Sequence, residues 1–198
     1  AAPGLRRRRQ EAGRPEETSR MKLQQGDALI LVDVQLDFLP GGRLAVPRGD
    51  EVVPALNRYI AVFRGLTFPV VATRDWHPAD HCSFQARGGP WPPHCVAGSD
   101  GARFAPLLDL PCEAHIVSKA TQREKDAYSG FEGTDLDAWL RQSGVTRVFV
   151  GGLATDYCVR ATVLDALREG FRVRVIEDGI RGIDVRPGDC DRARAEMQ

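Results

Sequence analysis

Short apolar runs alternate with amphipathic segments along this chain, and this alternation restricts the fold more than any other feature. The first run, ALILVDV at residues 28–34, is apolar up to Asp33, as expected for a strand buried on both faces of a parallel sheet. The amphipathic segments between such runs are typical of helices that connect parallel strands. The pattern therefore predicts an α/β fold with a doubly wound parallel sheet, layered α/β/α.

The runs and segments define the expected elements. The expected strands cover residues 28–34, 68–74, 114–120, 146–152 and 171–178. The expected helices cover residues 50–64, a segment that begins near Thr134 and ends at Gly144, residues 156–169, and a last segment after Gly188.

Local signals predict the helix ends and the buried helix faces. Asp50 is a candidate cap for the first helix, and Thr134 with Asp137 forms a T-x-x-D pattern that resembles a capping box. Gly65 and Gly170 are expected helix stops. The residues expected to face the core are Val53, Leu56, Ile60 and Phe63 in the first helix and Val159, Val163, Ala166 and Leu167 in the third.

The chain has one candidate domain and one segment that differs from it. Residues 1–20 are rich in arginine and almost free of large apolar side chains, so we expect a disordered tail. This tail is either a targeting or anion-binding patch, or a solvated, upstream-translated or vector-derived segment. Residues 21–198 are expected to form a single domain with its own core.

Charge and cysteine content limit the classes of partner and compartment. The 27 basic residues equal the 27 acidic ones, which gives no indication of a nucleic-acid or acidic-membrane partner. No apolar run approaches the length of a membrane span. The five cysteines are an odd, scattered set, which favours a reducing, cytoplasmic location over a disulfide framework.

Chemically active residues follow four of the expected strands. Asp33 ends the first, Asp75 and His77 follow the second, Lys119 lies in the third, and Cys158 follows the fourth. The carboxyl ends of parallel strands share one edge of a sheet, where ligands bind in folds of this class. We therefore expect these side chains to meet in one site.

Cys158 is the better candidate nucleophile, although Cys82 lies among histidines. It lies in GGLATDYCVRAT, a Gly-rich turn from strand to helix, where N–H groups and the helix dipole stabilise a thiolate or an oxyanion. The alternative is a small buried cysteine that packs the helix on the sheet. Asp33 and Lys119 are candidate proton acceptor and charge partner, or else a turn residue and a surface charge.

The long loop after residue 74 gathers metal-ligand types. RDWHPADHCSF, residues 74–84, contains an aspartate and two histidines beside Cys82. Pro78 makes this segment a loop and not a helix face. The alternatives are a closed structural zinc site that recruits Cys82 or Cys95, and histidines without a ligand role.

Five ordered blocks together resemble the nicotinamidase/pyrazinamidase branch of the isochorismatase-like cysteine hydrolases. The resemblance extends over residues 26–190. The blocks are LILVDVQLDF, TRDWHPADHCSF, WPPHCVAGS, SKATQREKDAYSGFEG and GGLATDYCVRAT.

The resemblance implies a role for individual residues. It implies a catalytic triad of Asp33, Lys119 and Cys158, and an oxyanion hole formed by the backbone N–H groups of Ala154 and Cys158. It implies that one divalent ion, Zn²⁺, Fe²⁺ or Mn²⁺, is held by Asp75, His77 and His94, with His81 as a direct or water-linked fourth position. Substrate contacts are implied for Phe38, Trp91, Leu153 and Tyr128, and a cis peptide for the bond between Leu153 and Ala154.

The resemblance also implies the reaction. Nicotinamide would be hydrolysed to nicotinate and ammonia through a cysteine thioester, while the metal ion binds the ring nitrogen and aims the carboxamide at Cys158. Pyrazinamide is expected to be accepted as well, and a homo-oligomer is possible for such a fold. The alternatives are another isochorismatase-like amidase and a catalytically silent metal-binding relative.

Overall fold

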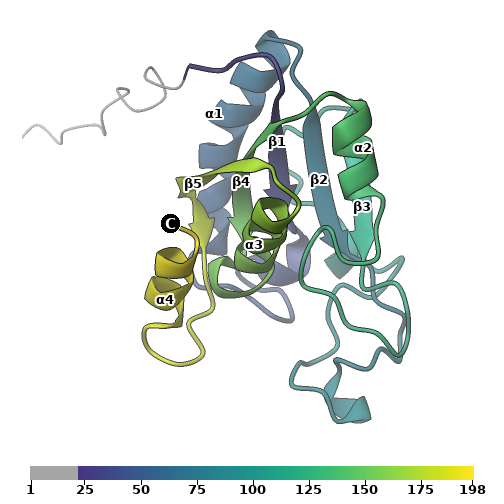
Figure 1. The fold of residues 1–198 in the computed structure, drawn as a ribbon. Helices are drawn as coiled ribbons and strands as arrows, with labels where there is room; N and C mark the ends of the chain where they lie inside the picture. Colours follow the sequence, from purple (N-terminus) through teal and green to yellow (C-terminus); the bar gives the residue numbers. More distant parts are fainter. Residues whose placement is uncertain (1–21) are drawn as a thin grey trace, which may run out of the picture.

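The computed structural model describes residues 22–198, so the expected tail at residues 1–20 lies outside the described part. A five-stranded, fully parallel sheet forms the centre of the molecule, with strand order β3-β2-β1-β4-β5 (Figure 1). This architecture confirms the α/β class. The strands are β1 (Asp27–Val32), β2 (Val70–Asp75), β3 (His115–Lys119), β4 (Arg147–Leu153) and β5 (Arg172–Arg181).

Helices cover both faces of the sheet, which confirms the doubly wound arrangement (Figure 1). One face packs against α1, and the opposite face packs against α2 and α3. The last helix lies beside α3 at the β5 edge. The helices are α1 (Val52–Gly65), α2 (Leu136–Gln142), α3 (Arg160–Arg168) and α4 (Asp189–Glu196).

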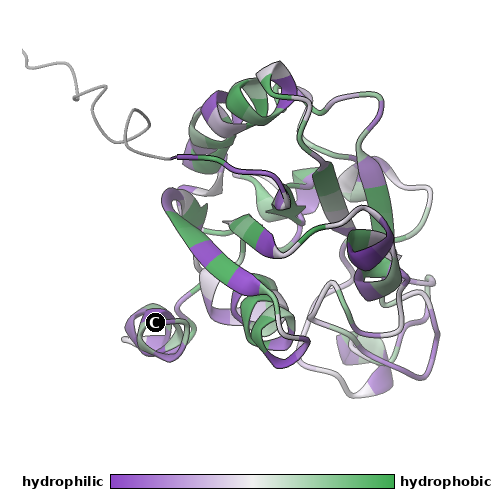
Figure 2. Ribbon diagram, turned by 45° about the horizontal axis from the view of Figure 1, so that its top comes forward, coloured by the Kyte–Doolittle hydropathy of each residue, from purple (hydrophilic) through white to green (hydrophobic). Residues whose placement is uncertain are grey.

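The position of β1 at the centre of the sheet explains why its apolar run is unbroken. Leu29 and Leu31 face α1, whereas Ile30 and Val32 face α2 and α3, and all four side chains are buried. Side chains alternate between the two faces of a strand, so a strand covered on both faces needs apolar residues at every position. The edge strand β5 instead begins with alternating hydrophilic and hydrophobic residues, from Arg172 to Val175 (Figure 2).

Two expected capping interactions are absent. Helix α1 begins after a 3-10 turn, Gly49–Glu51, and has no side-chain cap, so Asp50 does not cap it. The Thr134 hydroxyl accepts the N–H of Leu136 at 3.3 Å and donates to the carbonyl of Gly130, a residue that precedes α2. Asp137 pairs with Arg141 at 2.8 Å in place of closing a capping box.

The third expected helix divides into two parts. A π-helical turn, Thr155–Val159, comes first, and α3 follows it. Val159, Val163 and Ala166 are buried as expected, but Leu167 is 46% exposed. Leu167 lies at the margin of the apolar stripe in the last turn of α3, where the sheet no longer covers it.

The connection between β2 and β3 departs from the usual crossover. Parallel strands are normally joined by a helix, but residues 76–114 contain only two short 3-10 turns, Gln85–Arg87 and Asp100–Ala102. This connection extends beyond the carboxyl end of the sheet. It is the loop that carries the expected metal ligands. Across residues 22–198, none of the helices combines the length and apolar character needed to cross a bilayer.

Gly152 is required where β4 passes closest to β1. Its φ is +133°, and a Cβ there would lie 2.0 Å from the carbonyl oxygen of Val32. We expect Gly152→Ala to lower the free energy of unfolding by about 3 kcal/mol, because it adds backbone strain and an overlap with backbone atoms. Urea denaturation measures this change. Gly65→Ala is the control, since its Cβ meets no heavy atom within 4 Å, and an equal loss there would contradict the argument.

Candidate active site

Three side chains from separate strands meet beyond the carboxyl end of the sheet, as the sequence predicts. Asp33 follows β1, Lys119 is the last residue of β3, and Cys158 lies in the π turn after β4. The ammonium Nζ of Lys119 donates to Cys158 Sγ at 3.4 Å and lies 2.9 Å from Asp33 Oδ2. All three are buried, so the surface-charge alternative does not describe Lys119, and the Asp33 carboxylate pairs with the Lys119 ammonium.

Burial determines the protonation of this cluster. It raises the pKa of Asp33, although the Lys119 ammonium and a 2.6 Å hydrogen bond from Thr73 Oγ1 oppose the rise. It also raises the pKa of the Cys158 thiol well above its ordinary value, with Lys119 opposing. The expected thiolate is therefore disfavoured in the free protein, because removal from water raises the thiol pKa more than the Lys119 ammonium lowers it. A thiol beside a carboxylate calls for proton transfer to that carboxylate as the nucleophile attacks.

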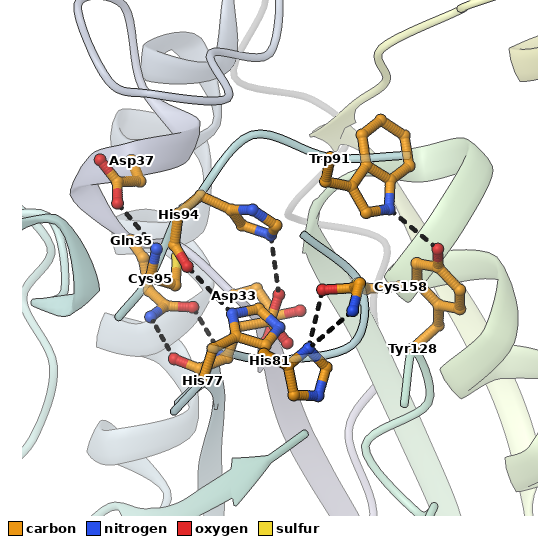
Figure 3. Close-up of polar contacts among 12 residues, drawn as sticks. Asp33, Gln35, Asp37, His77, His81, Trp91, His94, Cys95, Tyr128 and Cys158 are labelled. Carbon is orange, nitrogen blue, oxygen red and sulfur yellow. Dashed lines mark hydrogen bonds and ion pairs between the residues drawn. The ribbon is translucent and has the colours of Figure 1, made fainter. Parts of the chain in front are cut away.

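The metal-ligand candidates also converge. Asp75, His77 and His94 are buried, and their ligand atoms lie within 4.8 Å of one another. Asp75 is the last residue of β2, and the two histidines come from the β2–β3 connection. Figure 3 shows the imidazoles of His77 and His94 directed toward the same point.

Backbone carbonyls orient both imidazoles for metal binding. The Nδ1 of His77 lies 3.0 Å from the carbonyl oxygen of His94, and the Nδ1 of His94 lies 2.8 Å from that of Pro92. A carbonyl accepts only, so each Nδ1 carries the proton and each Nε2 has a free lone pair. Burial lowers the pKa of His77 to about 4, which keeps that ring neutral, as a ligand must be. The donor set fits a divalent ion such as zinc.

His81 lies beside this set without an available lone pair. Its ring is 4.6 Å from the His77 ring, centroid to centroid. Its Nε2 is 3.1 Å from the carbonyl oxygen of Lys125, so this nitrogen is the donor, and its Nδ1 is 2.8 Å from Ser83 Oγ. This geometry favours a water-linked position for His81 over direct ligation.

Neither loop cysteine joins a ligand cluster among residues 22–198. The Sγ of Cys82 lies 4.0 Å from the Nε2 of His81, which donates elsewhere. Cys95 is buried with its Sγ near the carbonyl of Gly101, and burial raises its pKa well above the ordinary value. The closed zinc site that would recruit these thiols is therefore not supported.

Lys119 connects the thiol cluster with the metal-ligand candidates, and the sequence analysis missed this link. Its ammonium forms ion pairs with both Asp33 and Asp75. Burial alone would lower the pKa of Lys119, but the two carboxylates hold it well above the ordinary value. Asp75 and Lys119 occupy the same register on adjacent strands, so pairing the ends of β2 and β3 would have revealed the contact.

Replacing Lys119 by methionine tests the balance of charge in this cluster. We expect Lys119→Met to lower the free energy of unfolding by about 3–5 kcal/mol, because Asp33 and Asp75 would remain buried without their cation. Urea denaturation of the metal-free protein at neutral pH measures the loss. Adding Asp33→Asn to this variant is expected to restore part of the stability. A loss below about 1 kcal/mol, the size of an exposed pair, would contradict the argument.

Aromatic residues close the space above Cys158. The indole Nε1 of Trp91 donates to the Tyr128 hydroxyl at 3.0 Å, and burial raises the pKa of Tyr128 to about 12 (Figure 3). Phe38 lies 5.6 Å from the His94 ring. Tyr157, which the sequence analysis missed, packs on Trp91 at 5.1 Å and on Tyr128 at 5.6 Å, and its position next to Cys158 was the available signal.

The turn before Cys158 has the special backbone that the resemblance implied. The peptide bond between Leu153 and Ala154 is cis. Ala154 is buried and its carbonyl accepts the N–H groups of Tyr157 and Val159, each at 3.1 Å. The Leu153 side chain is fully buried in the core beneath α1, which makes it a support behind the site.

Comparisons with known proteins agree with this architecture. The chain is 43% identical to the nicotinamidase of Escherichia coli strain K12 over 191 residues, which covers 86% of this chain and 90% of that protein. The crystal structure of pyrazinamidase of Pyrococcus horikoshii in complex with zinc has a TM-score of 0.83 and 55% identity, covering 87% of this chain and 94% of that one.

A further solved structure is that of PnC1 from L. infantum in complex with nicotinate. It has a TM-score of 0.79 and 40% identity, covering 86% of this chain and 87% of that one. The sequence profile of the isochorismatase domain matches residues 27–193, which include every strand and helix from β1 to β5 and most of α4. The chain therefore belongs to the isochorismatase family.

Proposed function

We propose that this protein is an amidohydrolase that converts nicotinamide to nicotinate and ammonia. The observation that carries the proposal is the position of Lys119, whose ammonium contacts Cys158, Asp33 and the metal-ligand candidate Asp75 together. A buried thiol with a proton acceptor thus adjoins a donor set for a divalent ion. The similarity to nicotinamidases supports the choice of substrate.

Acylation of the thiol forms the first half of the proposed mechanism. Asp33 accepts the Cys158 proton while the sulfur attacks the amide carbon, and Lys119 holds Asp33 in place. The backbone N–H groups of Ala154 and Cys158 hold the developing oxyanion. Asp33 then returns the proton to the leaving nitrogen, so that ammonia departs and a thioester remains.

Hydrolysis of the thioester completes the cycle. Water enters the position that ammonia has left, and Asp33 accepts its proton as the oxygen attacks the thioester carbon. Collapse of the intermediate breaks the carbon–sulfur bond and releases nicotinate. The proton on Asp33 returns to the Cys158 sulfur. The raised pKa of Asp33 suits both steps, since a group that alternates between acid and base needs a pKa nearer to neutral.

Asp75, His77 and His94 would hold one divalent ion in this mechanism. The bound ion would supply a Lewis-acidic contact for the ring nitrogen of the substrate and thereby fix the carboxamide relative to Cys158. The relative from Pyrococcus horikoshii contains zinc, which supports zinc among the candidates zinc, iron and manganese. Phe38, Trp91 and Tyr128 would enclose the ring.

We further propose a reducing compartment, the cytoplasm, for this protein. All five cysteines lie in the described part of the chain and all are free thiols. Disulfides are rare in the cytosol because thiols are kept reduced there.

Ammonia release from nicotinamide tests the proposed function. The purified, zinc-loaded protein is expected to produce ammonia and nicotinate in equal amounts, measured by a coupled ammonia assay and by chromatography. Pyrazinamide, a small-ring amide of similar shape, is the second substrate. Release from other amides but not from nicotinamide would favour a different amidase of this family. No hydrolysis of any amide by metal-bound protein would favour the silent relative.

A further inference from the structure

One short segment supports the backbone of all three metal-ligand candidates. Residues 35–38 follow Asp33 and include the 3-10 turn Leu36–Phe38. Two side chains of this segment, Gln35 and Asp37, are buried polar groups whose hydrogen bonds reach the ligand-bearing backbone (Figure 3). Neither has a part in the mechanism above.

Gln35 holds the backbone of Asp75 at both of its polar groups. Its Oε1 accepts the Asp75 N–H at 2.8 Å, and its Nε2 donates to the Asp75 carbonyl at 2.9 Å. The same Nε2 donates to the carbonyl of Ala102 at 3.0 Å, which anchors the far part of the β2–β3 connection. One fully buried amide therefore fixes the residue from which the Asp75 carboxylate projects.

Asp37 holds the segment that carries His94. Its Oδ2 accepts the N–H of Cys95 at 2.7 Å, and Cys95 has a left-handed φ of 45°. The carbonyls of His94 and Cys95 in turn lie 3.0 Å from the Nδ1 and the backbone N of His77. A hydrogen bond to one N–H thus fixes the placement of both imidazoles.

The carboxylate of Asp37 is closely surrounded. A Cβ on Gly101 would lie 2.1 Å from its Oδ2, so the carboxylate packs directly against the Gly101 backbone without space for a side chain there. Its Oδ1 accepts the N–H of Arg43 at 3.2 Å. The carboxylate is therefore confined between three chain segments, and its position determines theirs.

We propose that Gln35 and Asp37 are positioning residues that set the geometry of the metal site relative to Cys158. The inference rests on the metal site put forward under the proposed function. Because Asp33 lies two residues before Gln35, the same segment places the proton acceptor and the metal ligands. Interactions that orient metal ligands typically contribute 10–100-fold to metal affinity.

Zinc affinity tests this inference without any substrate. We expect Asp37→Ala and Gln35→Leu each to weaken zinc binding by about 10–100-fold in a chelator competition titration. Asp37→Asn retains an oxygen that can face the Cys95 N–H, so a smaller loss is expected, and this nearly isosteric variant serves if Asp37→Ala does not fold. The assay contains no nicotinamide, so its result does not depend on the reaction.

Two matched controls separate positioning from general stability. Asp27 is a buried carboxylate that accepts a backbone N–H, from Gln24 at 2.7 Å, at the opposite end of β1. Asn57 is an amide that joins the carbonyl of Leu107 and the N–H of Asp109. Asp27→Asn and Asn57→Leu are expected to lower the melting temperature and leave zinc affinity unchanged.

The outcomes are distinguishable. Weaker zinc binding by the Gln35 and Asp37 variants, with unchanged binding by both controls, supports the inference. Unchanged binding by all variants, or equal weakening in the controls, overturns it and leaves the metal site intact. Failure of the unaltered protein to bind zinc, iron or manganese overturns the metal site and this inference with it.

Discussion

Replacing Cys158 by alanine is expected to lower kcat for nicotinamide by at least about 10³-fold, as is usual when a covalent nucleophile is removed. Asp33 and Lys119 would remain in place, but no sulfur would be present to attack the amide carbon. Initial rates of ammonia release at saturating nicotinamide and zinc measure the loss. The residual rate then reports the contribution of binding and of the oxyanion hole alone.

Cys82→Ala is the matched control for this loss. Cys82 is the thiol nearest to the histidines, yet its sulfur lies 4.0 Å from the Nε2 of His81, a nitrogen that donates to the Lys125 carbonyl. Its removal is expected to change kcat less than about twofold, because surface-proximal substitutions outside the reacting groups have small effects. A large loss in Cys82→Ala together with a normal rate in Cys158→Ala would reverse the assignment of the nucleophile.

Trapping of the intermediate provides an independent measurement. Acid quenching during turnover should leave a nicotinoyl group on the intact protein, detectable by mass spectrometry and located on the peptide that contains Cys158. The Cys158→Ala protein should carry no such group. Turnover without any acylated species under these conditions would favour direct attack by water over a thioester.

Removing the metal ion is the second change with a large expected effect. We expect treatment with a chelator to reduce kcat/KM for nicotinamide by about 10²-fold or more. Without the ion the ring would no longer be fixed, and a displacement of about 1 Å of a reacting group lowers the rate by about that factor. Re-addition of zinc or manganese is expected to restore activity. His94→Ala should reproduce the loss permanently, because it removes one of three ligand candidates.

His115→Ala is the control for the histidine substitution. His115 is the one histidine outside the β2–β3 connection, and it stacks on Trp139 with ring centroids 4.3 Å apart. Its loss should leave kcat/KM and zinc affinity unchanged. If the chelated protein retained full activity while holding no metal, the proposed role of the ion in orienting the ring would be wrong.

The sequence predicts the site well because strand ends can be located from hydropathy alone. Asp33, Lys119 and Cys158 were expected to meet because each lies at or just after the end of an apolar run and parallel strands align those ends, and the family resemblance implied the same triad. The same reasoning placed Asp75 and Lys119 at this edge but did not predict the direct ion pair between them. That contact depends on strand order and register, which local patterns do not specify.

Local signals failed where tertiary contacts decided the conformation. Aspartate is a residue type that often caps helices, but α1 is preceded by a 3-10 turn that includes Asp50. The Asp50 side chain therefore does not cap α1. The place of Cys158 at a helix start indicated stabilisation of a thiolate. Its burial, which no short window of sequence reports, raises the pKa of the thiol instead.

The replacement of a crossover helix by the β2–β3 connection has a consequence for local unfolding. A helix in this position would form a regular ladder of backbone hydrogen bonds, whereas residues 76–114 are held by irregular turn hydrogen bonds within the connection and by a few bonds to the rest of the chain, such as that of the Cys82 N–H to the Arg123 carbonyl. Such a segment can open without unfolding the sheet. An ion bound by Asp75, His77 and His94 would link the start of this segment to its middle. Amide hydrogen exchange within the connection would then slow as the ion binds, so the exchange rate would measure the fraction of sites that hold an ion.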